Sequence, residues 1–297
     1  VHGYCRSDQD QVRAKITAME TEKELARASM GRSRSPYIAS QSFLTQLKKT
    51  LFHEETKKRF EMMLGEYAPS FMQSILSATT NNKLLMKADP TSIIRSSLVA
   101  AYTNLSIDTN LGQAALVPYG GVAQFQIMKN GYVQLAHRTG NVARINVANV
   151  YEGDIEAINP FTGDMRFNLN NPDRSILNGF VSYLKLMTGA DFYLYMTVDE
   201  CKTHGAKYSK SFYRENGLWQ TDFVAMGQKT VLKSIIKKWC PINPQQQPKI
   251  TAALKFDQSV PSSEDIESCD PIYVDGVDAK EAEKKEVDEI VAKITNE

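Results

Sequence analysis

The chain lacks the patterns that mark several large classes of protein. Only four cysteines and four histidines occur in 297 residues, no two cysteines form a C-x-x-C pair, and the histidines show no metal-ligand spacing. A Gly-x-x-x-x-Gly-Lys-Ser/Thr loop is absent, which argues against an ATP-driven motor. No apolar run approaches the roughly 18 residues of a membrane span, and the first residues lack the apolar core of a signal peptide. We therefore expect free thiols in a reducing cytosol, no metal or other cofactor, and no contact with a membrane.

Charge is unevenly distributed, although the formal net charge of the whole chain is only +1. Residues 262–297 hold twelve acidic and four basic side chains, so that residues 1–261 carry an excess of bases. A basic body favours a polyanionic partner, and an acidic tail favours a separate contact with another protein. An ordinary solvated surface is the alternative for both.

The spacing of apolar residues and turn residues predicts an α+β fold, in which helices flank a mostly antiparallel sheet. We expect a mobile N-terminal arm over 1–40, a core over 41–242, a linker rich in Pro, Gln and Ser over 243–263, and an acidic partner-binding tail over 264–297. The tail includes an amphipathic pattern over 279–295 that predicts a short helix.

The core itself divides into recognisable elements. Helical spacing covers 41–87, and Asp89-Pro90 is a good start for the next helix. The elements expected after it are a helix to about Asn104, a hairpin of Ala114–Val117 and Val122–Met128, a helix over Lys129–Arg138, a strand over Asn141–Tyr151, a hairpin of Ile155–Ile158 and Met165–Leu169, strands over Ile176–Leu186 and Phe192–Met196, a helix with a capping box at Thr197, and a helix over Phe223–Trp239 capped by Asp222.

The Phe223–Trp239 helix carries a row of three lysines, Lys229, Lys233 and Lys237, at successive i,i+4 positions opposite its apolar side. Like charges at this spacing repel one another, and no acid lies between residues 223 and 238 to offset them. Lys207 and Lys210 lie close by in sequence. The row predicts contacts that follow a phosphate backbone, although a solvated lysine stripe is the more common explanation of such a pattern.

The strand Val122–Met128 combines alternation with two glutamines. Gln124 and Gln126 share one face of the strand, while the apolar residues between them face the other side. Lys129 and Arg138 add charge at the two ends of the following helix. We interpret these four residues as donors to a nucleic acid, with a solvated sheet face as the alternative for the glutamines.

One sequence pattern gives weak support to a catalytic site. Pro172-Asp173, followed by Glu200-Cys201-Lys202, matches a loose P-D…E-x-K pattern of metal-dependent nucleases, in which the acids hold Mg²⁺. The spacing is free and each piece is common. Glu200 also has a competing role as the capping-box glutamate of Thr197.

Several linked segments resemble the RecT/Redβ family of phage recombinases. They are LVPYGGVAQFQIMKNGYVQLAHRTG, INVANVYEGD, MTVDECKTHGAKYSK, Trp219 and MGQKTVLKSIIKK, in the order that the family uses over about residues 80–242. Asn130 stands where a small residue is expected, and Ala143-Arg144 replaces a Tyr-Lys-type pair. The first 40 residues match no part of the family pattern.

The resemblance implies an ATP-independent single-strand annealing protein of a phage or prophage, active in the bacterial cytoplasm and not an enzyme. Such a protein coats single-stranded DNA, pairs it with a complementary strand, forms rings and helical filaments, and works beside a phage exonuclease and the host single-strand-binding protein. Arg144 joins the expected DNA contacts on this basis. A metal-dependent nuclease and an architectural DNA-coating protein without annealing activity are the alternatives.

Overall fold

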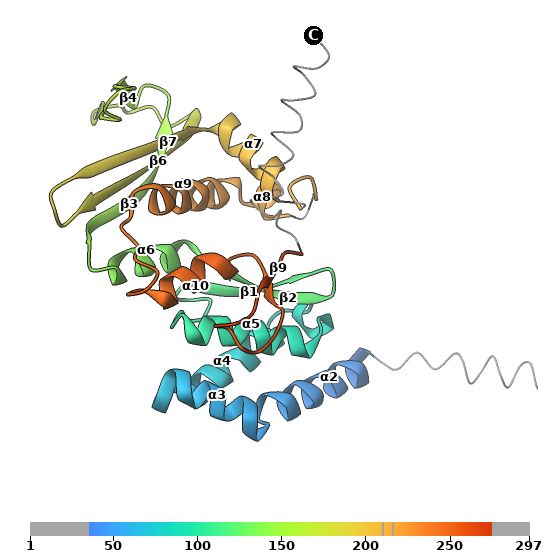
Figure 1. Ribbon diagram of the computed structural model, residues 1–297. Coiled ribbons are helices and arrows are strands. Elements are labelled where there is room, and N and C mark those ends of the chain that lie inside the picture. The colour runs from blue at the N-terminus through green and yellow to red at the C-terminus, as the bar shows by residue number, and fades with distance from the viewer. Residues whose placement is uncertain (1–35, 210, 216, 275–297) are drawn as a thin grey trace, which may run out of the picture. The chain divides into compact units, whose positions relative to one another are not determined.

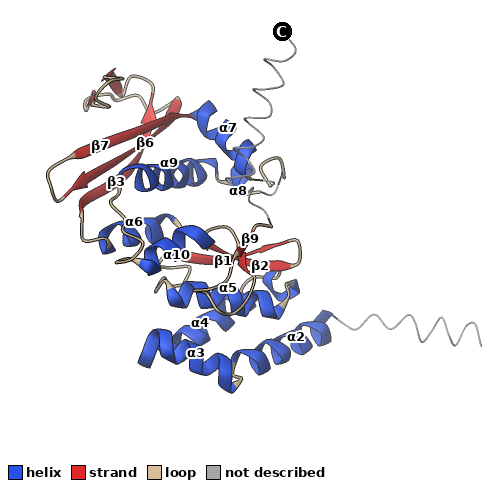
Figure 2. Ribbon diagram, in the orientation of Figure 1, coloured by secondary structure: helices blue, strands red, loops and turns tan. Residues whose placement is uncertain are grey.

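The computed structural model describes residues 36–209, 211–215 and 217–274. Contacts within the chain divide it after Thr45, and the residues from Gln46 onward form one unit. In this unit helices cover antiparallel strands (Figures 1 and 2), which confirms the α+β prediction. No helix in the described ranges is both long enough and apolar enough to cross a lipid bilayer.

The region predicted as helical over 41–87 is helical in the structure. It contains α2 (Pro36–Leu51), α3 (Glu54–Leu64), α4 (Ala68–Thr80) and two short 3₁₀ turns at Gly65–Tyr67 and Leu85–Lys87. Residues 36–40, expected in the arm, thus belong to a helix, and the remainder of the arm lies outside the described residues.

Helix α5 (Pro90–Tyr102) begins as predicted, because the Asp89 carboxylate accepts hydrogen bonds from two backbone N–H groups of the first turn. The helix ends two residues before the predicted end, since Asn104 has a left-handed φ of 52°. One face of α5 packs on the hairpin of β1 (Ala114–Tyr119) and β2 (Val122–Ile127), where Ser96 Oγ donates a 2.8 Å hydrogen bond to the Ala123 carbonyl.

The larger sheet has the antiparallel order β3–β6–β7, formed by β3 (Val142–Tyr151), β6 (Leu177–Leu186) and β7 (Asp191–Thr197). Helix α9 (Phe223–Trp239) lies along one face of it (Figure 1). Gly227 permits this close approach, because a Cβ at that position would lie 2.1 Å from the Phe180 ring.

The other elements surround this sheet and the hairpin. Helix α7 (Val198–Tyr208) begins with the predicted capping box, in which Thr197 and Glu200 accept hydrogen bonds from each other's backbone N–H groups. The bounds are α6 (Lys129–Arg138), β4 (Ile155–Ile158), β5 (Met165–Phe167), α7 (Val198–Tyr208), α8 (Leu218–Thr221), α10 (Pro248–Phe256), β8 (Val260–Pro261) and β9 (Pro271–Ile272).

The stretch 243–263 differs from the linker that its composition predicted. It contains helix α10 and strand β8, and α10 buries Ile250, Ala253 and Phe256. Helix α10 packs against α5 and β2 (Figure 1). The apolar side chains needed for packing are few here and are separated by polar residues, so composition alone concealed the helix.

The first part of the predicted tail is also packed against the core. Ile266 and Cys269 are each only 4% exposed, and Glu264 forms a 2.8 Å ion pair with Arg59 on α3. Strand β9 pairs with β8. The boundary at 263/264 is therefore not a structural boundary, and the helix predicted over 279–295 lies outside the described residues.

This packing predicts different results for two shortened chains. A chain that ends at Val274 keeps the contacts of 264–274 and is the reference for the comparison. A chain that ends at Ser263 should lose about 2 to 4 kcal/mol of stability, because it removes the buried Ile266 side chain and the partner of Arg59. Thermal and denaturant unfolding of the two proteins would measure the difference. Equal stability of the two would show that 264–274 contributes nothing to the core.

Candidate nucleic-acid interface

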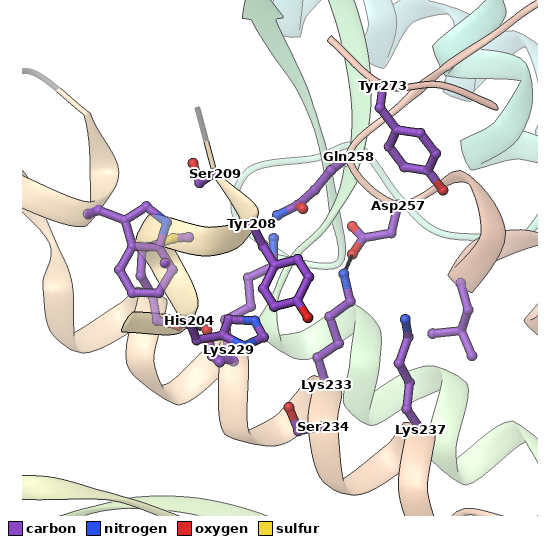
Figure 3. Close-up of a pocket in the computed structure, with 15 residues that line it drawn as sticks. His204, Tyr208, Ser209, Lys229, Lys233, Ser234, Lys237, Asp257, Gln258 and Tyr273 are labelled. Atoms are coloured by element: carbon purple, nitrogen blue, oxygen red, sulfur yellow. Dashed lines mark hydrogen bonds and ion pairs between the residues drawn. The ribbon is translucent and has the colours of Figure 1, made fainter. Parts of the chain in front are cut away.

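A cavity of about 240 Å³ lies beside the side of helix α9 that is turned away from the sheet (Figure 3). Most of its walls are formed by α7, by α9 and by the end of α10 with the chain that follows it, and Trp219 of α8 also lines it. Figure 3 shows the three lysines of the α9 row pointing from this helix towards Asp257 and Gln258. The main polar side chains around the cavity are His204, Tyr208, Lys229, Lys233, Ser234, Lys237, Asp257, Gln258 and Tyr273.

Asp257 is the one acidic residue among the described side chains that line this cavity, and it is 3% exposed. Its carboxylate accepts hydrogen bonds from the Ile127 backbone N–H at 2.9 Å and from the Tyr132 hydroxyl, and it forms a 2.6 Å ion pair with Lys233. Burial alone would raise the pKa of Asp257, but the charges of Lys233 and Lys229 and the hydrogen bonds outweigh it and lower the pKa to about 2. The carboxylate is therefore ionised and already fully engaged.

Lys229 is only 6% exposed, and its ammonium has no hydrogen-bond partner among the described residues. Burial lowers the pKa of Lys229 to about 8, with Asp257 opposing the change and Lys233 adding to it. A buried ammonium without a partner is unfavourable in the folded protein. It becomes favourable when an anion enters the cavity, so that Lys229 is a candidate ligand of an anion.

The rim of the cavity adds more positive charge. Lys237 is exposed one turn beyond Lys233, and Lys207 is half-buried on α7. Burial, reinforced by Lys233, Lys207 and Lys237, lowers the pKa of His204 to about 4, so this imidazole is neutral at pH 7. The rings of His204 and Tyr208 lie 4.6 Å apart on α7 and give the cavity an aromatic wall.

Two further hollows adjoin this cavity in succession through shared lining residues. One of about 140 Å³ shares Met226 and Lys229 with it and is also lined by Gln126 and Lys129. A larger one of about 870 Å³ shares Gln126 with the second and extends to Lys83, beyond the end of α4. These three adjoining hollows are termed the path, and Lys229, Gln126 and Lys129 are among the residues that line them.

The two glutamines differ from the exposed donors that the sequence predicted. Gln124 is 1% exposed and Gln126 is 6% exposed. The apolar residues between them are also buried, because α5 and α10 pack against this hairpin. Gln126 still lines the path, whereas Gln124 is enclosed, and its Oε1 has no hydrogen-bond partner among the described residues.

The remaining predicted contacts do not all meet at the cavity. Arg138 donates hydrogen bonds to the carbonyls of Thr103 and Asn104, and its guanidinium thereby satisfies the C-terminal end of α5. Burial lowers the pKa of Arg138. Arg144 pairs with Lys185 in the sheet, on the face opposite the one that Val147 presents to the core. Lys210 lies outside the described residues.

The acidic side chains of the nuclease-like pattern form hydrogen bonds with local backbone and hydroxyl groups. Glu200 Oε2 accepts hydrogen bonds from the backbone N–H and the hydroxyl of Thr197, as the capping-box prediction required. Asp173 Oδ1 accepts a hydrogen bond from the Ser175 N–H, and Lys202 lies 3.4 Å from Asp199. Within the described ranges no three His, Cys, Asp or Glu side chains are grouped as metal ligands.

Sequence reasoning missed the counter-ion of the lysine row. No acid was expected to offset these lysines, but Asp257 reaches Lys233 from 24 residues further along the chain. Tyr132, on the predicted helix Lys129–Arg138, is fully buried and donates a hydrogen bond to this carboxylate. Only the fold brings the three groups together, since nothing in the spacing of Tyr132, Lys233 and Asp257 indicates their contact.

The buried ammonium predicts that Lys229→Met stabilises the protein. At pH 7 the variant should gain roughly 1 to 3 kcal/mol, because it removes a buried charge that Asp257 offsets only in part. The gain should shrink as the pH rises from about 8 to 10.5, where wild-type Lys229 is neutral in the folded state but still charged in the unfolded state. Denaturant unfolding at pH 7 and pH 9.5 measures both effects. Destabilisation at both values would assign Lys229 to the structural core.

Comparison with known proteins places this site in a family. The family model described as the RecT family matches residues 69–268. A protein of Bacillus subtilis (strain 168), described as uncharacterized protein YqaK, is 35% identical over 232 residues, which cover 78% of this chain and 80% of that protein. The matched region contains the lysines of the cavity, Asp257 and every other lining residue except Tyr273. The chain therefore belongs to the RecT family, the DNA single-strand annealing proteins of phage recombination.

Proposed function

We propose that this protein is an ATP-independent single-strand annealing protein that coats single-stranded DNA and pairs it with a complementary strand, without covalent chemistry and without a cofactor. One observation carries the proposal beyond family membership: a cavity lined by three lysines, one of them buried and unpartnered among the described residues, adjoins a hollow lined by Gln126 and Lys129.

Annealing requires only that a strand be held by its backbone while its bases stay free for a second strand. Base pairing then reads the sequence, and the protein reads charge and shape. The lysines of α9 suit this role, because successive i,i+4 side chains on one helix face lie about 6 Å apart, similar to the spacing of phosphates along a strand. No nucleophile is needed at such a site.

The energetics of this site also favour assembly. Non-specific electrostatic contacts alone give dissociation constants of roughly 10⁻⁴ to 10⁻⁶ M at physiological salt. Neighbouring subunits that share one strand bind it far more tightly, and a repeating path requires head-to-tail contacts, as in rings or helical filaments. The exposed Met62 and Tyr67 near the end of α3 are candidates for such contacts, whereas the apolar residues of α5 are buried.

The expected partners follow from the phage context of the family. A phage exonuclease would supply the single strand, and the host single-strand-binding protein would cover it, in the bacterial cytoplasm. The acidic residues 275–297 would repel DNA and so are better suited to a protein partner than to the strand.

An annealing assay tests the function. Two complementary oligonucleotides, labelled for energy transfer, should form duplex much faster with the protein than without it, in the absence of nucleotide and with or without Mg²⁺. Non-complementary strands are the control. Strand cleavage in Mg²⁺ would support a nuclease, and binding without faster pairing would support a DNA-coating protein. Light scattering of the same samples should show larger assemblies on two strands added in sequence than on one strand.

The salt dependence of binding tests the lysine row. Lys237→Ala should reduce the slope of log K against log salt concentration by about 0.7, the value for one lost contact with a phosphate of a single strand. Lys237 is preferable to Lys233 for this purpose, since the loss of Lys233 would leave the buried Asp257 without its ion pair. Lys238→Ala is the matched control, because Lys238 lies on the same helix over the Trp239 ring and does not line the cavity. An unchanged slope for Lys237→Ala would mean that Lys237 contacts no phosphate and belongs to an ordinary solvated surface.

A further inference from the structure

The cavity beside α9 holds more positive charge than its own acid neutralises. Among its described lining residues are three lysines and a single carboxylate, that of Asp257. This carboxylate already forms an ion pair with Lys233 and accepts hydrogen bonds from Tyr132 and Ile127. Lys229 and Lys237 therefore have no acidic partner of their own among these lining residues, and they add about two positive charges at pH 7. Such an excess in one cavity favours an anion that carries two negative charges.

The two kinds of phosphate in DNA differ in this respect. An internal phosphodiester carries one negative charge. A terminal phosphomonoester carries nearly two at pH 7, since its second pKa is about 6, and it has three strongly accepting oxygens. The buried ammonium of Lys229 favours the more highly charged group, because charge interactions are stronger where water is excluded.

The surroundings also fit the nucleotide that bears such a phosphate. The rings of His204 and Tyr208 lie 4.6 Å apart at a tilt of 44° and form an aromatic wall that a base can contact. The volume of about 240 Å³ exceeds what a phosphate group needs, since one water occupies about 30 Å³ of liquid. The adjoining hollow at Gln126 and Lys129 shares Lys229 with the cavity, so that further nucleotides of the strand have polar and basic side chains nearby.

We infer that this cavity binds the terminal phosphate of a DNA strand, together with its nucleotide, in preference to an internal phosphodiester. The inference rests on the proposed function for the strand itself, but the recognition of the terminal phosphate concerns only the cavity. An annealing protein with such a site would hold a strand by its end as well as along its length, which would fix where pairing begins.

Binding to four forms of one oligonucleotide tests the inference. The full chain is titrated into labelled strands that carry a 5′-phosphate, a 3′-phosphate or no terminal phosphate, and into the covalently closed circle. One of the phosphorylated ends should bind about tenfold more tightly than the unphosphorylated strand at low salt, which corresponds to about 1.4 kcal/mol. The end that binds more tightly identifies the polarity of the strand. Equal affinity for all four forms would overturn the inference.

Two variants make the result specific to the cavity. Lys229→Met should abolish the preference for the phosphorylated end, and the stability measurement above establishes whether this variant is folded. Lys238→Ala should keep the preference, because Lys238 lies outside the cavity. A preference that survives in Lys229→Met would place the recognition elsewhere.

A second measurement separates this inference from the proposed function. A deoxynucleoside monophosphate alone should raise the unfolding temperature of the wild-type protein and not that of Lys229→Met. If this stabilisation occurs while annealing is not accelerated, the site stands and the proposed function fails. If annealing is accelerated but neither the monophosphate nor the strand end is recognised, the proposed function stands and the terminal site fails.

Discussion

The buried carboxylate of Asp257 is the interaction on which the arrangement of the site depends. It joins the backbone of β2 through Ile127, the side of α6 through Tyr132, and α9 through Lys233. A charge in this position would be costly by itself, and each of its partners would be less favourable without it. The network therefore fixes the hairpin, α6 and α9 relative to one another and to the end of α10. The same network orients the lysine row towards the cavity.

The stable ion pair of Asp257 and Lys233 lies beside a buried ammonium that destabilises the folded protein. Lys229 lies one helical turn from Lys233 but has no hydrogen-bond partner in the described part of the chain. Its ammonium costs stability in the free protein, and the cost is recovered only when an anion is bound. Residues with this property are typical of binding sites, where function is selected at the expense of stability. The pair of adjacent lysines thus has two separate roles: Lys233 maintains the structure, and Lys229 is available to a ligand.

The position of α9 also depends on a small residue. Gly227 lies against the Phe180 ring, and any side chain at this position would push the helix away from the sheet. Close packing of α9 on β6 leaves the opposite side of the helix to face α7 and the end of α10. The cavity exists between these elements because the apolar face of α9 is fully used by the sheet. One face of α9 therefore belongs to the hydrophobic core, and the opposite face lines the cavity.

The sequence by itself determined the elements and the family of this protein. Helix starts at Asp89, Thr197 and Asp222 were predictable because capping is a local interaction, and the hairpins were predictable because alternation and glycine turns are local as well. Only the tertiary structure decided which polar residues are exposed. Gln124 became buried under helices that are remote in sequence, Asp257 reached the lysine row from a stretch predicted as a linker, and Arg138 became the partner of a helix end. Burial and ion pairing depend on which segments meet in space, and neither periodicity nor composition contains that information.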